Sequence, residues 1–465
     1  SALPRAVRLN LVRSARASLA QPWPELPATL FLEFARIGNR SHFESRWFER
    51  RRRLALLVLA ECVEGRGAFL DPIANALWSL CEESTWSFPA HLPSAGLPDT
   101  AVPHVDLFAA ETGALLAWTH YLLADALNGV APVIAPRLVR EIVHRILTPC
   151  LTRSDFWWMG FGSRAVNNWN PWINSNWLAC NLLIEPDPAR RVRATAKILR
   201  SLARFADPYP DDGGCDEGPS YWTRAGASLF DNLDLLHRAT RGRLDLFQHP
   251  KGREIGRFIV RAHLADRWFL NFADAPALMA PPVGLTYRFG RRIGDRALQN
   301  LARSFLAGSN PAAGRASDSL GRALPDLFDV TGLRPGAEAP LPRDVFLPDI
   351  QVMVARSAAG SARGFTLAAK GGHNAESHNH NDVGHFVLYR EGRPVLIDAG
   401  VETYSRKTFS RDRYSIWTMQ SAFHNLPIIN GVQQQPGREF QAKEVNCRTT
   451  SKRVDFDLDI AHAYP

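Results

Sequence analysis

The sequence predicts an α+β, multidomain chain in which a long helical region precedes an antiparallel β domain. Apolar residues recur at three-to-four spacing from about residue 5 to residue 310, as in DLFAAETGALLAWTHYLLADAL, which is the period of an amphipathic helix. After about residue 346, short alternating segments such as GHFVLYRE and RPVLIDAG follow one another with turn residues between them. The period of the apolar pattern therefore changes once along the chain, from helical to extended.

Residues 1–310 are predicted to form one helical domain, because consecutive amphipathic helices with almost no strand signal favour hairpins that form an array or close into a toroid. Residues 311–345 are rich in Ala, Gly and Pro and are predicted to be a linker. Residues 346–465 are predicted to form the antiparallel β domain. This domain is short for a two-sheet sandwich, so we expect the natural chain to continue past it.

The composition of the chain limits the kinds of binding partner that we expect. The chain has 465 residues, 46% of them apolar and 22% charged, which is usual for a globular protein, and no apolar run is long enough to predict a membrane span. The net charge of +9 favours an anionic partner, although an arginine-rich genome explains it equally well. No basic run predicts nucleic-acid binding. The six cysteines form no CxxC pair and are expected to be buried thiols.

A histidine cluster opens the β region. Four of the 14 histidines fall within thirteen residues: His373, His378, His380 and His385. Asp398 ends the next predicted strand, and His424 lies in the loop SAFHNLP. Two histidines and one carboxylate with an open position suit zinc, and the same groups suit proton transfer near neutral pH. The alternative is a polar loop with unrelated histidines.

The segment NNWNPWINSNW, residues 167–177, combines asparagine amides, which donate to a carboxylate without adding charge, with tryptophan rings, which stack on sugars. The alternative is a helix start with asparagine caps and buried indoles. We expect Trp169 and Trp177 to be partly structural and the asparagines to be functional as a set. The asparagines are Asn167, Asn168, Asn170, Asn174 and Asn176.

Two further loops hold candidate residues. DDGGCDEGPSYWTRAG, residues 211–226, leads into a helix, and its Tyr221 can exchange a proton if an arginine or a metal lies beside it. Asp216 and Glu217 in this loop can cap the helix, support other side chains or act as a glycosidase acid and base. In CEESTWSFPAHLP, Trp86 and His91 either line a cleft or pack within a surface loop.

Taken together, these segments resemble the heparinase II/III-like polysaccharide lyases, a superfamily that includes alginate and oligoalginate lyases. HNHNDVGHFVLY…LIDAG…FHN carries the resemblance most strongly, and the resemblance covers most of the chain. It implies an incomplete (α/α) toroid followed by an antiparallel β-sandwich. It also implies β-elimination on an acidic, uronate-containing polysaccharide or oligosaccharide. A bacterial periplasmic or secreted location is expected, with a cytoplasmic one left open.

The resemblance implies roles for single residues. His380, Asp398 and His424 fall on the family's zinc ligands, where the metal is structural. His378 falls on a histidine that faces the substrate, and Tyr221 falls on the tyrosine that moves protons. Substrate contacts are expected from Trp86, His91, Trp169, Asn170, Asn176 and Glu217.

Asn167 and Asn168 fall where the family commonly has Asn-His, so the second position departs from the pattern. An asparagine cannot act as a base, although it can bind a uronate carboxylate. Tyr221 and His378 then share the proton transfers, or the substrate differs, or activity is lost. A glycoside hydrolase that uses Asp216 or Glu217 and an inactive acidic-glycan-binding protein stay open as alternatives.

Overall fold

The computed structural model describes residues 3–93, 96–306 and 319–465, and these fall into two compact units. Unit 1 takes its described residues from Ser1–Asp207, Ser228–Leu244 and Gly308–Leu333. Unit 2 takes its described residues from Pro208–Ala227, Asp245–Ala307 and Arg334–Pro465. The chain therefore leaves unit 1 and returns to it twice.

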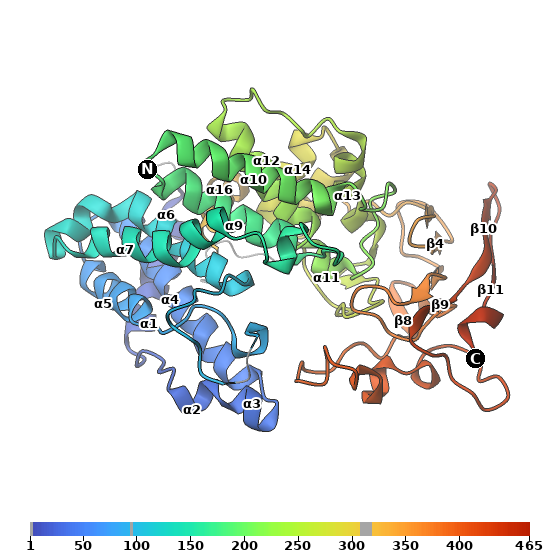
Figure 1. Cartoon of the computed structure of the whole chain (residues 1–465). Coiled ribbons are helices and arrows are strands. Elements are labelled where there is room, and N and C mark those ends of the chain that lie inside the picture. The colour runs from blue at the N-terminus through green and yellow to red at the C-terminus, as the bar shows by residue number, and fades with distance from the viewer. Residues whose placement is uncertain (1–2, 94–95, 307–318) are drawn as a thin grey trace. The chain divides into compact units, whose positions relative to one another are not determined.

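Unit 1 is helical, as the three-to-four spacing predicts. Its longer helices are α1 (Arg5–Leu19), α4 (Ser41–Glu64), α5 (Leu70–Cys81), α6 (Leu107–Val130), α7 (Ile134–Ile142), α9 (Trp169–Ile184), α10 (Pro188–Ala206), α12 (Gly226–Ala239, from Ser228 onward in this unit) and α16 (Leu320–Thr331). Short helices connect them: α2 (Ala28–Phe31), α3 (Glu33–Ile37), η1 (Pro89–His91), η2 (Val143–Leu147), α8 (Thr148–Thr152) and η3 (Trp157–Met159). Figure 1 shows α4, α5, α6, α7 and α9 gathered in the blue to green part of the chain.

Helix α6 is the central helix of unit 1. It packs against α4, α5, α7, α9 and α16. Its first two turns are buried almost all round, so it lacks the single apolar stripe of a surface helix. The Asp106 side chain caps it by accepting hydrogen bonds from the backbone N–H groups of Phe108 and Ala109 at 3.1 and 2.8 Å. The same carboxylate accepts the N–H of Phe88 at 3.1 Å and lies 2.6 Å from His91 Nδ1, so it ties the loop after α5 to this helix.

Unit 2 combines helices with antiparallel sheets. Its main sheet has the order β3-β4-β5-β7-β8, with β3 (Asp344–Leu347), β4 (Val352–Arg356), β5 (Phe365–Lys370), β7 (Phe386–Arg390) and β8 (Arg393–Leu396). The smaller sheets pair β1 (His263–Ala265) with β2 (Trp268–Phe269), β6 (His373–Asn374) with β9 (Gly437–Gln441), and β10 (Lys443–Thr449) with β11 (Val454–Asp459). Its helices are α11 (Pro219–Trp222), α13 (Pro250–Arg261), α14 (Val283–Arg292) and α15 (Arg296–Ser304), together with η5 (Arg413–Ser415), η6 (Trp417–Met419), η7 (Ser421–Phe423) and η8 (Ala461–Ala463).

The main sheet has the alternation that its sequence predicts. In β5, exposed or half-buried residues alternate with buried ones, and β7 has the same pattern. β5 pairs with β7 in the register Leu367 to Leu388, which aligns the two patterns across the sheet. A mixture of helices with antiparallel sheets is therefore confirmed.

The predicted linker needs one correction. Residues 311–318 of the segment 311–345 lie outside the described residues, but Leu320–Thr331 within it forms helix α16, which packs on α6. Its periodicity is weak in the sequence because Pro325 interrupts the helical pattern. The two compact units also divide the helical region differently from a boundary at residue 310, since α13, α14 and α15 belong to unit 2.

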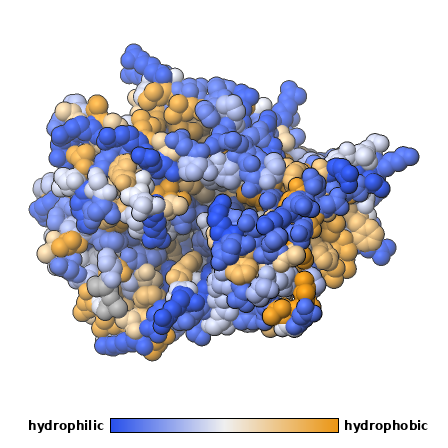
Figure 2. All heavy atoms as spheres, turned by 45° about the vertical axis from the view of Figure 1, so that its right-hand side comes forward, coloured by the Kyte–Doolittle hydropathy of each residue, from blue (hydrophilic) through white to orange (hydrophobic). Residues whose placement is uncertain are grey.

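Hydrophobic residues on the face in Figure 2 lie in small groups among hydrophilic ones. Within the ranges that the structure describes, no helix combines the length and the apolar character that a bilayer crossing requires. This agrees with the expectation from the sequence.

Substitution of Asp106 tests how strongly its hydrogen bonds stabilise unit 1. Burial raises the pKa of its carboxyl group, but the contacts with His91 and with backbone N–H groups outweigh burial, so its pKa in the folded chain lies below the usual value. Asp106→Ala should lower the free energy of unfolding by about 2 kcal/mol or more, because three buried N–H groups lose their acceptor. The loss should shrink as the pH falls through the folded-state pKa. Denaturant unfolding measures both effects.

Asp187→Ala is the matched control, since Asp187 caps α10 by one exposed hydrogen bond to Ala189 N–H. It should cost about 1 kcal/mol or less. Equal costs for the two variants would contradict the role given to Asp106.

Candidate active site and metal centre

Separate segments of unit 2 meet around one group of polar side chains. Glu217 and Tyr221 come from the loop that ends in α11, and Asp274 follows β2. His378 lies between β6 and β7, and Tyr404 follows β8. All five belong to the same compact unit, so their contacts can be described directly.

Tyr221 and His378 lie against each other. Their ring centroids are 4.1 Å apart, with the planes tilted by 36°. The Tyr221 hydroxyl lies 2.6 Å from the Tyr404 hydroxyl. The sequence predicts Tyr221 and His378 as members of one site, and the structure places them in contact. Tyr404 was missed, because a tyrosine in a loop carries no distinguishing pattern.

Both ring nitrogens of His378 face carboxylates. Nδ1 lies 2.7 Å from Asp274 Oδ2, and Nε2 lies 3.2 Å from Glu217 Oε2. Burial lowers the pKa of this imidazole, but the two carboxylates raise it more, to about 9. The backbone of His378 has φ of 57°, a left-handed conformation that is uncommon outside glycine and is held here by the ring contacts.

Asp274 is a buried carboxylate with a donor from each of four residues. Oδ2 lies 2.7 Å from His378 Nδ1 and 2.9 Å from the Tyr404 hydroxyl. Oδ1 lies 3.0 Å from His380 Nε2 and 2.9 Å from an Arg413 guanidinium nitrogen. Burial raises the pKa of Asp274, but these contacts, led by His378, hold it well below the usual range. Asp274 stands in the run NFADAP, which has no pattern that predicts a functional residue.

His380, Asp398 and His424 could hold a metal ion. Their candidate ligand atoms lie within 4.8 Å of one another, and all three residues are buried. Within the described part of the chain, His380 Nδ1 and His424 Nε2 have no hydrogen-bond partner, while Asp398 Oδ2 lies 3.0 Å from His385 Nε2 and 3.4 Å from His424 Nδ1. Buried polar atoms normally find partners, so a cation bound among these atoms fits them.

His385 supports this set without belonging to it. The backbone N–H of Asn425 donates to His385 Nδ1 at 2.9 Å, so in the neutral ring the hydrogen is on Nε2. His385 Nε2 lies 3.0 Å from Asp398 Oδ2. Burial raises the pKa of Asp398, but His385 and His424 hold it below its usual range, as a metal-binding carboxylate requires.

A buried lysine fixes the loop that carries the two histidines. Lys370 Nζ, at the end of β5, lies 2.9 Å from Glu376 Oε2 and 2.7 Å from Asp382 Oδ1. The Asp216 carboxylate accepts the backbone N–H of Ser377 at 3.0 Å, which ties the same loop to the one before α11. Asp216 is thus a loop support, one of the roles the sequence left open.

The asparagine-tryptophan segment belongs to unit 1. Asn167 Oδ1 accepts the backbone N–H of Trp169 at 3.1 Å, and Asn168 is buried at the start of α9. The half-buried Trp169 ring lies 4.6 Å from the His91 ring and 5.1 Å from Trp157, between centroids. These contacts leave the predicted roles of Asn167, Asn168, Trp169 and His91 as predictions.

One predicted substrate contact, Asn170, is corrected, and two others, Trp86 and Asn176, form hydrogen bonds within unit 1. Asn170 is fully buried, and its amide donates to the Trp158 carbonyl at 2.8 Å and to Ser201, so it joins helices rather than facing a ligand. Trp86 is 1% exposed and donates to the Leu80 carbonyl at 2.9 Å. Asn176 is half-buried and donates to the Trp172 carbonyl at 2.9 Å, back along its own helix.

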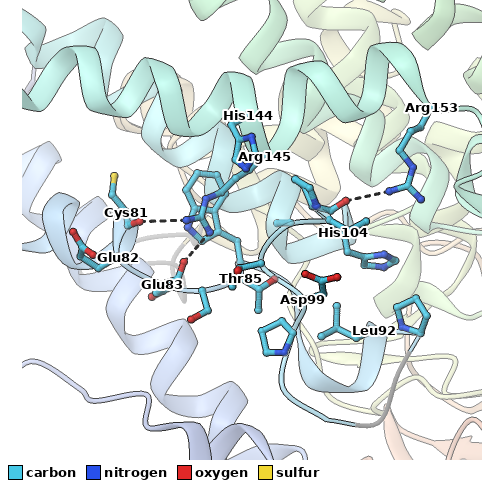
Figure 3. Close-up of a pocket in the computed structure, with 18 residues that line it drawn as sticks. Cys81, Glu82, Glu83, Thr85, Leu92, Asp99, His104, His144, Arg145 and Arg153 are labelled. Atoms are coloured by element: carbon cyan, nitrogen blue, oxygen red, sulfur yellow. Dashed lines mark hydrogen bonds between the residues drawn. The ribbon is translucent and has the colours of Figure 1, made fainter.

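Unit 1 also contains a cavity of about 570 Å³ (Figure 3). Its lining includes Trp86, Arg145 and Arg153. Arg145 donates to the carbonyls of Glu83 and Cys81 at 2.8 and 3.2 Å, and Arg153 donates to the Pro103 carbonyl at 3.2 Å. Both guanidinium groups are therefore engaged by the wall of the cavity itself.

Comparison with known proteins finds a family match at the C-terminal end of the chain. Residues 339–464 match the family described as heparinase II/III-like, C-terminal. This match confirms the resemblance to the heparinase II/III-like superfamily that the HNHND run indicates. No curated protein matches the sequence.

Solved structures are similar to this chain in fold. The crystal structure of heparinase III has a TM-score of 0.62 at 12% identity, over 92% of this chain and 59% of that one. A mutant of heparan sulfate lyase HepC from Pedobacter heparinus has a TM-score of 0.52 at 14% identity, over 96% of this chain and 63% of that one. The chain thus spans about three fifths of the length of these two proteins.

The matched segment, residues 339–464, contains only part of the candidate site. It supplies His378, His380, Asp398 and His424, while Tyr221 and the other residues of the loop before α11 precede it. The candidate site is therefore completed by residues outside the matched segment.

Lys370 provides a test of how the histidine loop is held. Burial raises the pKa of Glu376 and outweighs the effect of Lys370, which leaves it at about 7. Lys370→Met should lower the free energy of unfolding by about 3–5 kcal/mol at pH 8, because two buried carboxylates lose their cation. The defect should be smaller at pH 5.5, since Glu376 is then protonated. Denaturant titrations at the two pH values check this.

Lys251→Met is the control in the same unit. Lys251 pairs at 2.9 Å with Asp211, whose side chain is 87% exposed. This change should cost less than about 1 kcal/mol at either pH. A comparable defect in both variants would show that burial of the lysine is not the cause.

Proposed function

We propose that the protein is a polysaccharide lyase that cleaves a uronate-containing polysaccharide or oligosaccharide by β-elimination and leaves an unsaturated uronate end. One observation carries the proposal: the Tyr221 ring lies against His378 while its hydroxyl meets that of Tyr404. Titratable side chains in mutual contact suit a reaction that removes a proton from C5 and delivers a proton to the leaving oxygen on C4. The likeness to heparinase III supports the same class.

In the proposed reaction, the C5 proton leaves, the C5–H electrons form the C4–C5 double bond, and the C4–O4 bond breaks. Tyr221, as a phenolate, takes the C5 proton, and the phenol so formed returns this proton to the leaving O4. His378 is better suited to carry positive charge than to take the C5 proton, because both of its ring nitrogens face carboxylates. A charged imidazole would stabilise the negative charge that develops on the uronate carboxylate.

Asn167 and Asn168 are proposed to donate hydrogen bonds to the uronate carboxylate, as a neutral pair in place of Asn-His. In the same proposal the helical region is an incomplete (α/α) toroid and the β region is a sandwich. We also propose an exported bacterial protein, since the substrates of such enzymes are extracellular polymers.

His380, Asp398 and His424 are proposed to bind zinc. The mixture of two imidazoles and one carboxylate, all buried and with an unpartnered nitrogen on each imidazole, suits that ion. When bound, zinc supplies a fixed positive charge that stabilises this set of side chains. The residues themselves bring the loops after β6, β8 and η7 together.

We favour the lyase over a hydrolase because Asp216 accepts a backbone N–H and Glu217 faces His378. These contacts occupy the carboxylates that a hydrolase would need for acid and base work. An inactive glycan-binding protein would bind acidic polysaccharides without forming product.

The function is tested by ultraviolet absorbance, because elimination produces a conjugated uronate and hydrolysis does not. Heparan sulfate, alginate and glucuronan cover different uronate contexts. Tyr221→Phe should reduce turnover of the cleaved polymer by about 10²-fold or more, since the ring stays and the exchangeable proton is lost.

Tyr287→Phe makes the same chemical change on α14, outside the residues described for the site, and should leave the rate within about 2-fold. Full activity in Tyr221→Phe would end its assignment. Products without the ultraviolet band would indicate the hydrolase instead.

Zinc is tested by elemental analysis of protein purified without chelators. The native chain should carry about one zinc per molecule, and Asp398→Asn should lose most of it, with lower thermal stability, because a charged ligand is removed. Asp349→Asn, in an exposed loop of the same unit, should keep the metal. A native chain without bound metal would contradict the proposal.

A further inference from the structure

Asp274 contacts two histidines that have different proposed tasks. His378 and His380 are two residues apart on one loop, and each turns a ring nitrogen toward this carboxylate. Oδ2 meets His378 Nδ1 at 2.7 Å, and Oδ1 meets His380 Nε2 at 3.0 Å. One histidine is thus held by Nδ1 and the other by Nε2.

The surroundings of Asp274 fix where the hydrogens lie. An ionised carboxylate only accepts hydrogen bonds, and its two oxygens offer about four lone-pair positions. The Tyr404 hydroxyl at 2.9 Å and Arg413 at 2.9 Å take the two positions that the histidines leave. Every neighbour of the carboxylate must therefore donate, so His378 carries a hydrogen on Nδ1 and His380 carries one on Nε2.

The ring nitrogens that do not face Asp274, His378 Nε2 and His380 Nδ1, then have different surroundings. His378 presents Nε2, which lies 3.2 Å from Glu217 and next to the Tyr221 ring. A neutral His380 with its hydrogen on Nε2 has its lone pair on Nδ1, and this atom lacks a hydrogen-bond partner among the described residues while lying in the candidate metal set. A carboxylate that accepts from the far nitrogen of a histidine is a common second partner of metal-binding imidazoles.

The backbone at both ends of this contact is held in a costly conformation. Ala273, directly before Asp274, has φ of 58°, and His378 has φ of 57°. Non-glycine residues in this region persist where the surrounding contacts require them. The residue before Asp274 and His378 itself thus both adopt the left-handed conformation at this contact.

We propose that Asp274 is a positioning residue that fixes a hydrogen on His378 Nδ1 and on His380 Nε2, so that His380 binds metal through Nδ1 while His378 presents the Nε2 side of its ring to the substrate. The part that concerns His378 rests on the proposed lyase function. The part that concerns His380 requires only that a divalent metal binds. The carboxylate therefore links the metal centre to the proton-transfer site.

The first experiment uses Asp274→Asn in the full chain, with Zn²⁺ as the probe. An amide of the same shape cannot accept from four donors, so Zn²⁺ affinity in competition with a chromophoric chelator should fall about 10–100-fold. On any polymer that the native chain cleaves, kcat should fall about 10²-fold or more, with KM changed less than about 3-fold. His378→Gln should lower kcat and retain Zn²⁺, and His380→Gln should lose Zn²⁺.

Asp295→Asn is the matched control, because Asp295 is a largely buried carboxylate of the same unit that caps α15 and pairs with Arg257. It should keep both Zn²⁺ affinity and kcat. If Asp274→Asn keeps native Zn²⁺ affinity, or changes it no more than Asp295→Asn does, the proposal is overturned.

A measurement on the unmutated chain covers the case in which Asp274→Asn does not fold. Long-range ¹H–¹⁵N spectra of Zn²⁺-loaded protein labelled at histidine report which nitrogen of each ring carries a hydrogen, with His378→Gln and His380→Gln used for assignment. We expect His380 to be metal-bound at Nδ1 with its hydrogen on Nε2, and His378 to carry a hydrogen on Nδ1. Binding of zinc through His380 Nε2 would overturn the proposal. If no polymer is cleaved, the lyase function fails, while the zinc and spectral results still decide the role of Asp274.

Discussion

A single buried carboxylate organises the candidate site. Asp274 receives donors from residues 378, 380, 404 and 413, which are more than 100 positions away in the sequence. Burying a charge without partners is strongly unfavourable, so each of the four donors stabilises this part of unit 2. The site therefore depends on the completed tertiary structure rather than on any one loop.

Buried charges also hold the loop that carries His378 and His380. Lys370 is buried between Glu376 and Asp382, and the loop between these acids carries both histidines. The loop is held at its two ends by charge and in its middle by the rings on Asp274. Side chains fixed in this way lose little freedom when a ligand arrives, which favours precise chemistry.

Much of the fold could be predicted because it follows from local periodicity. Most helices of unit 1 and the strands β4, β5, β7 and β11 lie where the spacing of apolar residues places them. Helix α16 was missed because Pro325 interrupts its period.

The candidate site was predictable only where chemistry is dense in the sequence. The HNHND run indicated His378 and His380, and the loop of residues 211–226 indicated Tyr221, to which the resemblance then gave a role. Asp274 stands alone in a plain loop, and only the folded chain shows that it meets the two histidines. Asn170 misled for the opposite reason, since the sequence cannot distinguish an amide that faces a ligand from one that faces a buried carbonyl.

The interleaving of the two units has a consequence for any attempt to divide the chain. A fragment that contained only residues 339–464 would hold every proposed zinc ligand, yet it would lack Tyr221, Glu217 and Asp274. During synthesis these three residues leave the ribosome more than 60 residues before β3, the first strand of the main sheet. The residues of the β region that they contact in the folded chain are synthesised later. Residues 339–464 alone therefore could not assemble the candidate site.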